Sequence, residues 1–335
     1  MKHISLIVKI LFVGALFFAI FEFTDWRNLL DQAKQISPVT ILALILLVLL
    51  QAALLSLRWT RLAHMTNHHL PYLTAFAGTL VSFFLSQGLP STVSGDALRI
   101  WWMRRNGILM RDSTITIVFD RLFGLVSLLI VCIFSLLLLA DRSQHPALTA
   151  ASQTLAACIV LGLTGSALLM LPNRTGLSDW VFRIAVRMPR WIATPVHWIL
   201  EFRNVASQLS RDVVNLGMIL VIGIGVHFLT VLSGFLVARD LNLNVSIFGC
   251  LAAIAPALLI SYLPISIAGW GVRETSIMTA FGLIGVGTEP ALIISLAIGF
   301  SVLATSILGG LIWLLSGVRE AYVKSPLAER KSQPG

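Results

Sequence analysis

Six apolar stretches constrain the fold of this chain, because each is long enough to cross a bilayer as a helix, which takes about 20 residues. They are residues 5–23, 39–57, 113–139, 150–171, 213–236 and 290–316. The composition agrees: of the 335 residues, 57% are hydrophobic and 12% are charged, whereas about 25% are charged in ordinary soluble domains. The sequence therefore predicts an all-α polytopic membrane protein and excludes a soluble globular fold.

Two further apolar stretches, 72–112 and 247–286, are interrupted midway by proline, glycine and charged residues. With the N-terminus in the cytoplasm, loops 58–71 and 172–212 are cytoplasmic and rich in arginine, as membrane topology favours. The basic loops and tail all lie in the cytoplasm only if each interrupted stretch enters and leaves on one side, as a re-entrant hairpin.

The N-terminal stretch lacks a small-residue cleavage site. We therefore predict a retained first span, an inner (cytoplasmic) membrane location and cytoplasmic termini.

The two interrupted stretches share a sequence pattern. Residues 89–99 and residues 263–273 both read Leu-Pro, four residues, Gly, three residues, Arg. The same shift of 174 residues carries the span at 39–57 onto the span at 213–236. The chain thus reads as span, span, hairpin, span, repeated once. Because three spans reverse the direction of the chain, the second repeat is predicted to be inverted, as in many secondary transporters.

This repeat predicts the organisation of a single transmembrane domain that covers residues 1–335. The first repeat covers residues 1–139 and the inverted second repeat covers residues 150–316. Residues 172–212 place arginines on one helical face and apolar side chains on another, which is typical of a connector lying at the membrane surface. Residues 317–335 form a basic, polar cytoplasmic tail.

The hairpin breaks are the first candidate site. Non-helical backbone at membrane depth lies within protein or lines a wet cavity, so both breaks should face the interior. The N–H groups that begin the second helix of each hairpin can bind an anion, and an arginine one turn later can grip phosphate oxygens in pairs. The predicted substrate-binding residues are Pro90, Gly95 and Arg99 in the first hairpin and Pro264, Gly269 and Arg273 in the second. Facing breaks would form a phosphate-sized pocket.

Acidic residues accompany both hairpin arginines. Asp96 lies three residues before Arg99, a spacing that allows an ion pair within the helix. Glu274 adjoins Arg273, and its side chain is expected to point elsewhere. Three roles stay open for these acids: structural ion pairing, headgroup binding and proton coupling.

Charges also lie inside the predicted spans. Asp120 and Arg121 occupy the span at 113–139, where an unpaired charge costs at least about 2.5–3.5 kcal/mol. Adjacent helical residues point about 100° apart, so we expect one of the two to reach a hairpin charge and hold the first hairpin. His227 in the span at 213–236 either titrates during transport or packs through a hydrogen bond.

The search for catalytic chemistry gives no motif. The sequence contains no Gly-x-Ser-x-Gly elbow, Walker loop or dinucleotide fingerprint, and no acidic or cysteine partners complete a metal set with the histidines. The net charge of +9 follows from cytoplasmic loops and contact with anionic lipid, so no nucleic-acid partner is predicted. We expect no enzymatic activity, no cofactor and no metal.

Three motifs in order resemble the transmembrane region of lysylphosphatidylglycerol synthases. They are residues 89–99, the Asp-Arg-Leu-Phe-Gly sequence at 120–124, and residues 264–274. The family's first motif often reads Gly-Gly-Asp, whereas this chain has Ser94-Gly95-Asp96. The resemblance implies lipid translocation, with aminoacyl transfer assigned to a separate cytosolic domain. We expect no synthase activity here, because the sequence ends about 19 residues after its last predicted span.

The sequence thus predicts a lipid flippase or transporter for an anionic or phosphate-bearing lipid, with aminoacylated, polyprenyl and hopanoid-related lipids all open. Its expected partners are membrane phospholipid or a lipid-linked substrate, and lipid-synthesis enzymes are further candidates. Two alternatives remain: an intramembrane transferase that uses Asp96 or Glu274 as base, and a non-catalytic accessory subunit in lipid or glycolipid synthesis.

Overall fold

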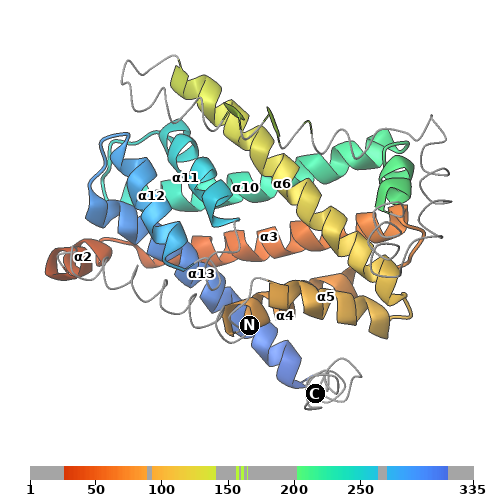
Figure 1. The fold of residues 1–335 in the computed structure, drawn as a ribbon. Coiled ribbons are helices and arrows are strands. Elements are labelled where there is room, and N and C mark those ends of the chain that lie inside the picture. Colours follow the sequence, from red (N-terminus) through yellow and green to blue (C-terminus); the bar gives the residue numbers. More distant parts are fainter. Residues whose placement is uncertain are drawn as a thin grey trace, which may run out of the picture.

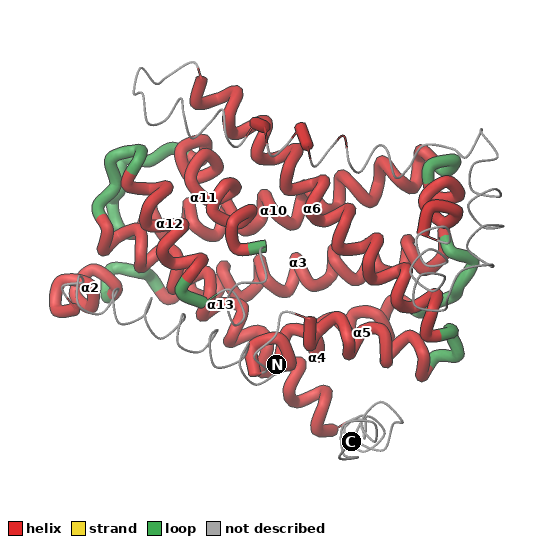
Figure 2. Tube along the Cα trace, viewed as in Figure 1, coloured by secondary structure: helices red, strands yellow, loops and turns green. Residues whose placement is uncertain are grey.

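The computed structural model describes residues 26–88, 93–140, 202–262 and 270–315, with a few further positions between 156 and 164. All secondary structure in these residues is helical, and short loops join the helices (Figure 2). The labelled helices are α2 (Trp26–Ala33), α3 (Pro38–Met65), α4 (Tyr72–Gly88), α5 (Val93–Arg105), α6 (Met110–Ala140), α10 (Val213–Asp240), α11 (Ile247–Ser261), α12 (Val272–Gly282) and α13 (Thr288–Leu315). Residues 202–209 are helical as well.

Four of these helices, α3, α6, α10 and α13, are long and apolar enough to cross a membrane. They confirm four predicted spans, while the predicted spans at 5–23 and 150–171 lie almost wholly outside the described residues. Helix α3 extends to Met65, beyond the predicted span end at residue 57. Arg58 is therefore a buried helical residue, and its assignment to a cytoplasmic loop was wrong.

Each interrupted stretch forms two shorter helices that pack against each other, α4 with α5 and α11 with α12. The breaks at 89–92 and 263–269 lie outside the described residues. Helix α5 begins at Val93, so Gly95 lies in its first turn and not before it as expected. Whether the two pairs are re-entrant stays a prediction.

The helices of the two halves pack in the same pattern. Helices α3 and α10 run side by side in opposite directions through the centre (Figure 1). Helix α4 packs on α13 as α11 packs on α6, and α5 packs on α6 as α12 packs on α13. Exchanging α3–α6 for α10–α13 thus reproduces the packing, which supports the predicted repeat.

Helices α3 and α10 also begin in the same way. The Ser37 hydroxyl accepts a hydrogen bond from the Thr40 N–H, and the Asp212 carboxylate accepts one from the Asn215 N–H. Both are N-caps that satisfy a free N–H group of the first turn. Hydrogen bonds from the side chain and backbone of Asn215 hold the pKa of the Asp212 carboxyl below its usual range.

Matched turns end the helices. Asn67 after α3 has φ 62° and Asn242 after α10 has φ 53°, and Gly107 after α5 and Gly285 after α12 have φ 85° and 83°. In each case the following N–H bonds to a carbonyl five residues earlier, which defines a Schellman cap. The α3 and α10 turns coincide at a shift of 175 residues, one more than the shift between the breaks.

Small residues allow α4 to lie close to its neighbours, as is common between membrane helices. A Cβ atom on Gly95 of α5 would lie 2.3 Å from the Ser86 hydroxyl. A Cβ atom on Gly309 of α13 would lie 2.0 Å from the carbonyl oxygen of Leu80. Glycine is therefore required on both sides of α4, and the first hairpin is held in a fixed position.

Candidate functional site

A buried ion-pair cluster centres on Asp120 of α6. One carboxylate oxygen accepts a hydrogen bond from Arg58 Nε of α3 at 2.7 Å, and the other accepts one from Arg99 Nη1 of α5 at 2.8 Å. The Asp120 side chain is 2% exposed and that of Arg99 is 9% exposed. The cluster confirms that Asp120 reaches a hairpin charge. With two guanidinium groups and one carboxylate, it carries an excess of one positive charge.

One edge of the Arg99 guanidinium, which we call its open edge, has no hydrogen-bond partner in the described part of the chain. Its Nε and Nη2 atoms are buried and have no hydrogen-bond partner within the described part of the chain, and its plane lies over the Trp59 ring at 4.3 Å. Nε and Nη2 share one edge of the guanidinium, an edge that can hold two oxygens of a carboxylate or phosphate. The site therefore presents a fixed, charged pair of donors with no acceptor.

In a second ion pair, the corresponding edge of another arginine, Arg121, is occupied by a carboxylate. Arg121 Nε and Nη2 of α6 donate to the two carboxylate oxygens of Asp96 in α5, both at 2.8 Å. Asp96 thus pairs with Arg121, and not with Arg99 as its spacing allowed, because the neighbouring helix offers two aligned donors. Arg121, like Asp120, reaches the first hairpin, and this pair ties α5 to α6.

In the second hairpin, Glu274 is fully buried and accepts hydrogen bonds from several groups. One oxygen accepts from the Gly271 N–H at the start of α12. The other accepts from Arg273 and, at 3.4 Å, from the Ser295 hydroxyl of α13. The expectation that Glu274 points elsewhere was wrong, because the Arg273 side chain folds back over the beginning of α12.

Arg273 is held between an aromatic ring and a glycine. Its guanidinium lies 4.6 Å from the centre of the Trp270 ring, and a Cβ atom on Gly299 of α13 would lie 2.2 Å from Arg273 Nη2. Glu274 therefore occupies the place at the start of α12 where an anion was expected to bind. The two hairpins differ: Arg99 has an open edge, whereas Arg273 is paired with its own neighbour.

The two helix pairs contact each other through residues at the ends of α4 and before α12. Gln87 at the end of α4 accepts a hydrogen bond from the indole N–H of Trp270, just before α12, at 3.2 Å. These residues flank the two breaks, so the end of α4 and the residue before α12 lie close together.

A second contact between the halves lies at Gly124 of α6. A Cβ atom there would lie 3.2 Å from the hydroxyl of Tyr262, at the end of α11, and 3.4 Å from the Arg58 guanidinium. His227 of α10 is buried, and its Nε2 lies 3.1 Å from the Gly124 carbonyl oxygen. This contact fits the packing role left open for His227, and its titration in a transport cycle stays a prediction.

The sequence prediction did not include four residues of the site: Arg58, Trp59, Gln87 and Tyr262. Three residues that it did include, Pro90, Pro264 and Gly269, lie outside the described part of the structure. Arg58 could have been found, since Leu62 and Ala63 continue the buried face of its helix. Gln87 and Tyr262 carry no comparable signal, because their contacts depend on how the hairpins pack.

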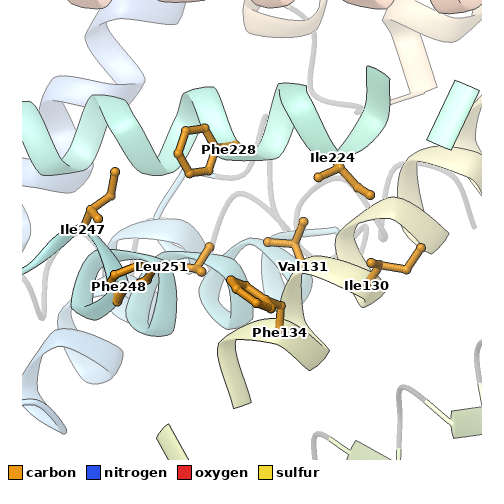
Figure 3. A pocket seen from close by; sticks show the side chains of 8 residues that line it. All are labelled: Ile130, Val131, Phe134, Ile224, Phe228, Ile247, Phe248 and Leu251. Carbon is orange, nitrogen blue, oxygen red and sulfur yellow. The ribbon is translucent and has the colours of Figure 1, made fainter. Parts of the chain in front are cut away.

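An apolar hollow of about 290 Å³ lies between α6, α10 and α11, and no charged residue lines it (Figure 3). Its lining consists of Ile130, Val131, Phe134, Ile224, Phe228, Ile247, Phe248 and Leu251. Within the described residues, no three His, Cys, Asp or Glu side chains come close enough to hold a metal ion. The polar chemistry therefore lies in the arginine and carboxylate pairs.

A comparison with protein families finds a match over most of the chain. Residues 6–310 match the family described as the lysylphosphatidylglycerol synthase transmembrane region, and no curated protein matches the chain. The match covers both hairpins and every ion pair of the site. Together with the four apolar helices, it identifies a multi-pass membrane protein. The chain belongs to the lysylphosphatidylglycerol synthase transmembrane-region family.

Proposed function

We propose that this protein is a lipid flippase or transporter that moves a lipid with an anionic, phosphate-bearing headgroup across the inner membrane. The open Nε and Nη2 edge of Arg99, in a buried cluster with one excess positive charge, is the observation that carries the proposal. Membership of a family of membrane domains named for a lipid synthase supports it.

The environment of Arg99 explains why it needs an anion. A buried donor without an acceptor costs about 1–3 kcal/mol, and more when the group is charged. Two phosphate oxygens would satisfy Nε and Nη2 together, and the Trp59 ring fixes the direction of that edge. Because both atoms are covered, the headgroup reaches them only when the surrounding helices part, while the acyl chains stay in lipid.

The proposal includes inverted repeats, re-entrant hairpins and cytoplasmic termini. The matched packing and turns of the two halves support the repeat, and rocking of repeats against each other is a common transport movement. The contact between Gln87 and Trp270 lies where such a movement would separate the hairpins. Asp96 and Arg121 would position α5, and Glu274 would position Arg273 or couple transport to protons.

The two alternative functions make different demands on these residues. An intramembrane transferase needs Asp96 or Glu274 as a free base, and both carboxylates accept hydrogen bonds from arginines. An accessory subunit needs no anion at Arg99, so substitution there would leave its function intact. We therefore favour transport over enzymatic activity.

The test is lipid translocation in proteoliposomes that contain fluorescent phosphatidylglycerol, followed by chemical quenching of the outer leaflet with and without a pH gradient. We expect Arg99→Gln to slow translocation about tenfold or more, because a charged hydrogen bond contributes about 1.5–3 kcal/mol. Arg105→Gln is the matched control, since Arg105 lies on the same helix, is exposed and also stacks on a tryptophan. No translocation by the unmodified protein, or full activity of Arg99→Gln, would contradict the proposal.

A further inference from the structure

The ion pairs that hold the two hairpins have an uneven charge balance. They contain four arginines and three carboxylates: Arg58, Arg99, Arg121 and Arg273 with Asp96, Asp120 and Glu274. We call this set the hairpin charge network. If every group is ionised, the network carries one excess positive charge, and the excess lies at the Asp120 cluster because the other two pairs are each neutral.

Every carboxylate of the hairpin charge network is engaged by positive or N–H donors. Asp96 uses both oxygens for Arg121, and Asp120 divides its oxygens between Arg58 and Arg99. Glu274 accepts from Gly271 on one oxygen and from Arg273 on the other. Each carboxylate of the network is thus already neutralised by an arginine, so a headgroup ammonium would find no unneutralised carboxylate there and would meet an excess of like charge.

The free donors of the network match one kind of group. The open edge of Arg99 offers two parallel N–H donors, and Asp96 on Arg121 shows within this protein how two oxygens fill such an edge. A phosphodiester supplies two oxygens and a single negative charge, which brings the network to neutrality. A phosphomonoester would carry about 1.5–2 negative charges at neutral pH, and a zwitterionic or aminoacylated lipid would add a cation.

We infer that the translocated lipid is a phosphodiester with one negative charge and no ammonium group in its headgroup, as in phosphatidylglycerol. The inference rests on the proposed function and narrows its substrate class. It selects against aminoacylated and zwitterionic lipids, because the network has unpaired donors for an anion but no unneutralised carboxylate for a cation.

The test compares headgroups on the full chain in proteoliposomes. The assay measures translocation of acyl-labelled phosphatidylglycerol, phosphatidylethanolamine, phosphatidic acid and lysyl-phosphatidylglycerol, each against unlabelled phosphatidylglycerol as competitor. We expect phosphatidylglycerol to move at least about tenfold faster than the other three, since unpaired and like charges at a desolvated site are strongly disfavoured. Excess inorganic phosphate should not slow the translocation of labelled phosphatidylglycerol. If phosphate slowed it as much as unlabelled phosphatidylglycerol does, the assignment of a lipid substrate would be overturned.

Arg121→Gln provides a second measurement. It releases the Asp96 carboxylate from its cation, so the ratio of phosphatidylethanolamine to phosphatidylglycerol translocation should rise. Asp112→Asn removes a partly exposed carboxylate on the same helix and should leave that ratio unchanged. Equal rates for all four lipids, or a preference for the aminoacylated lipid, would overturn the inference while the proposed transport stands. No movement of any lipid would instead overturn the proposed function, and the inference with it.

Discussion

Replacing Asp120 by asparagine is expected to lower the free energy of unfolding by about 3–5 kcal/mol, the cost typical of breaking a buried ion pair. The carboxylate lies between Arg58 and Arg99 at hydrogen-bond distance from both. Without it, two buried guanidinium groups would repel each other with no carboxylate between them. Because α3, α5 and α6 each contribute one of these residues, the loss should loosen the first hairpin as a whole.

Thermal unfolding in detergent micelles, followed by tryptophan fluorescence, measures this effect. Asp112→Asn is the matched control, because Asp112 lies on the same helix in a partly exposed pair with His68 at 3.2 Å. Such exposed pairs contribute about 1 kcal/mol or less. Arg99→Met in the Asp120→Asn background should recover part of the lost stability, since it removes one unpaired charge. Equal stability of the Asp120→Asn and Asp112→Asn proteins would contradict the central role of the cluster.

The long helices could be predicted from the sequence because lipid leaves few alternatives to an apolar stretch of that length. Backbone groups in the hydrocarbon core must form their hydrogen bonds within the helix. Hydropathy therefore predicts nearly all the ends of α3, α6, α10 and α13 to within a few residues. The exception is the end of α3. A count of basic residues assigned Arg58 to a loop, but the count cannot recognise an arginine that is neutralised by a carboxylate on another helix.

The pairing of charges could not be predicted in the same way. Arg99 and Asp120 are 21 residues apart, and their contact depends on how α5 lies against α6. Spacing along one helix favoured Asp96 with Arg99, but the structure gives each of them a partner from α6. The contact between Gln87 and Trp270 joins residues 183 positions apart and involves no charge, so the sequence carries no signal for it.

The difference between the two halves has a functional consequence. The repeat aligns Asp96 with Trp270, so the second motif lacks that carboxylate and has Glu274 directly after its arginine. Glu274 then neutralises Arg273 and caps α12, whereas the carboxylates of the first half leave an edge of Arg99 open. Symmetric packing with asymmetric charge favours one anion site in the first half over the two equivalent sites that the repeat predicted.

Replacing Gly309 by alanine is expected to destabilise the protein by about 3 kcal/mol, at the upper end of the usual cost of overpacking. The added Cβ atom would lie 2.0 Å from the Leu80 carbonyl oxygen and 2.4 Å from its carbon. These are backbone atoms of α4, so no side-chain rotation can relieve the contact. Helices α4 and α13 would have to move apart.

Helix α4 has little room to yield, because Gly95 of α5 packs closely against its opposite side near Ser86. A displaced α4 should shift the first hairpin and slow lipid translocation as well as lower the unfolding temperature. Gly217→Ala is the matched control: Gly217 lies within α10, and a Cβ atom there meets nothing within 4 Å, so alanine should be neutral or stabilising by up to about 1 kcal/mol. A Gly309→Ala protein that matches Gly217→Ala in both assays would show that α13 does not fix α4, and the position of Arg99 would then need another support.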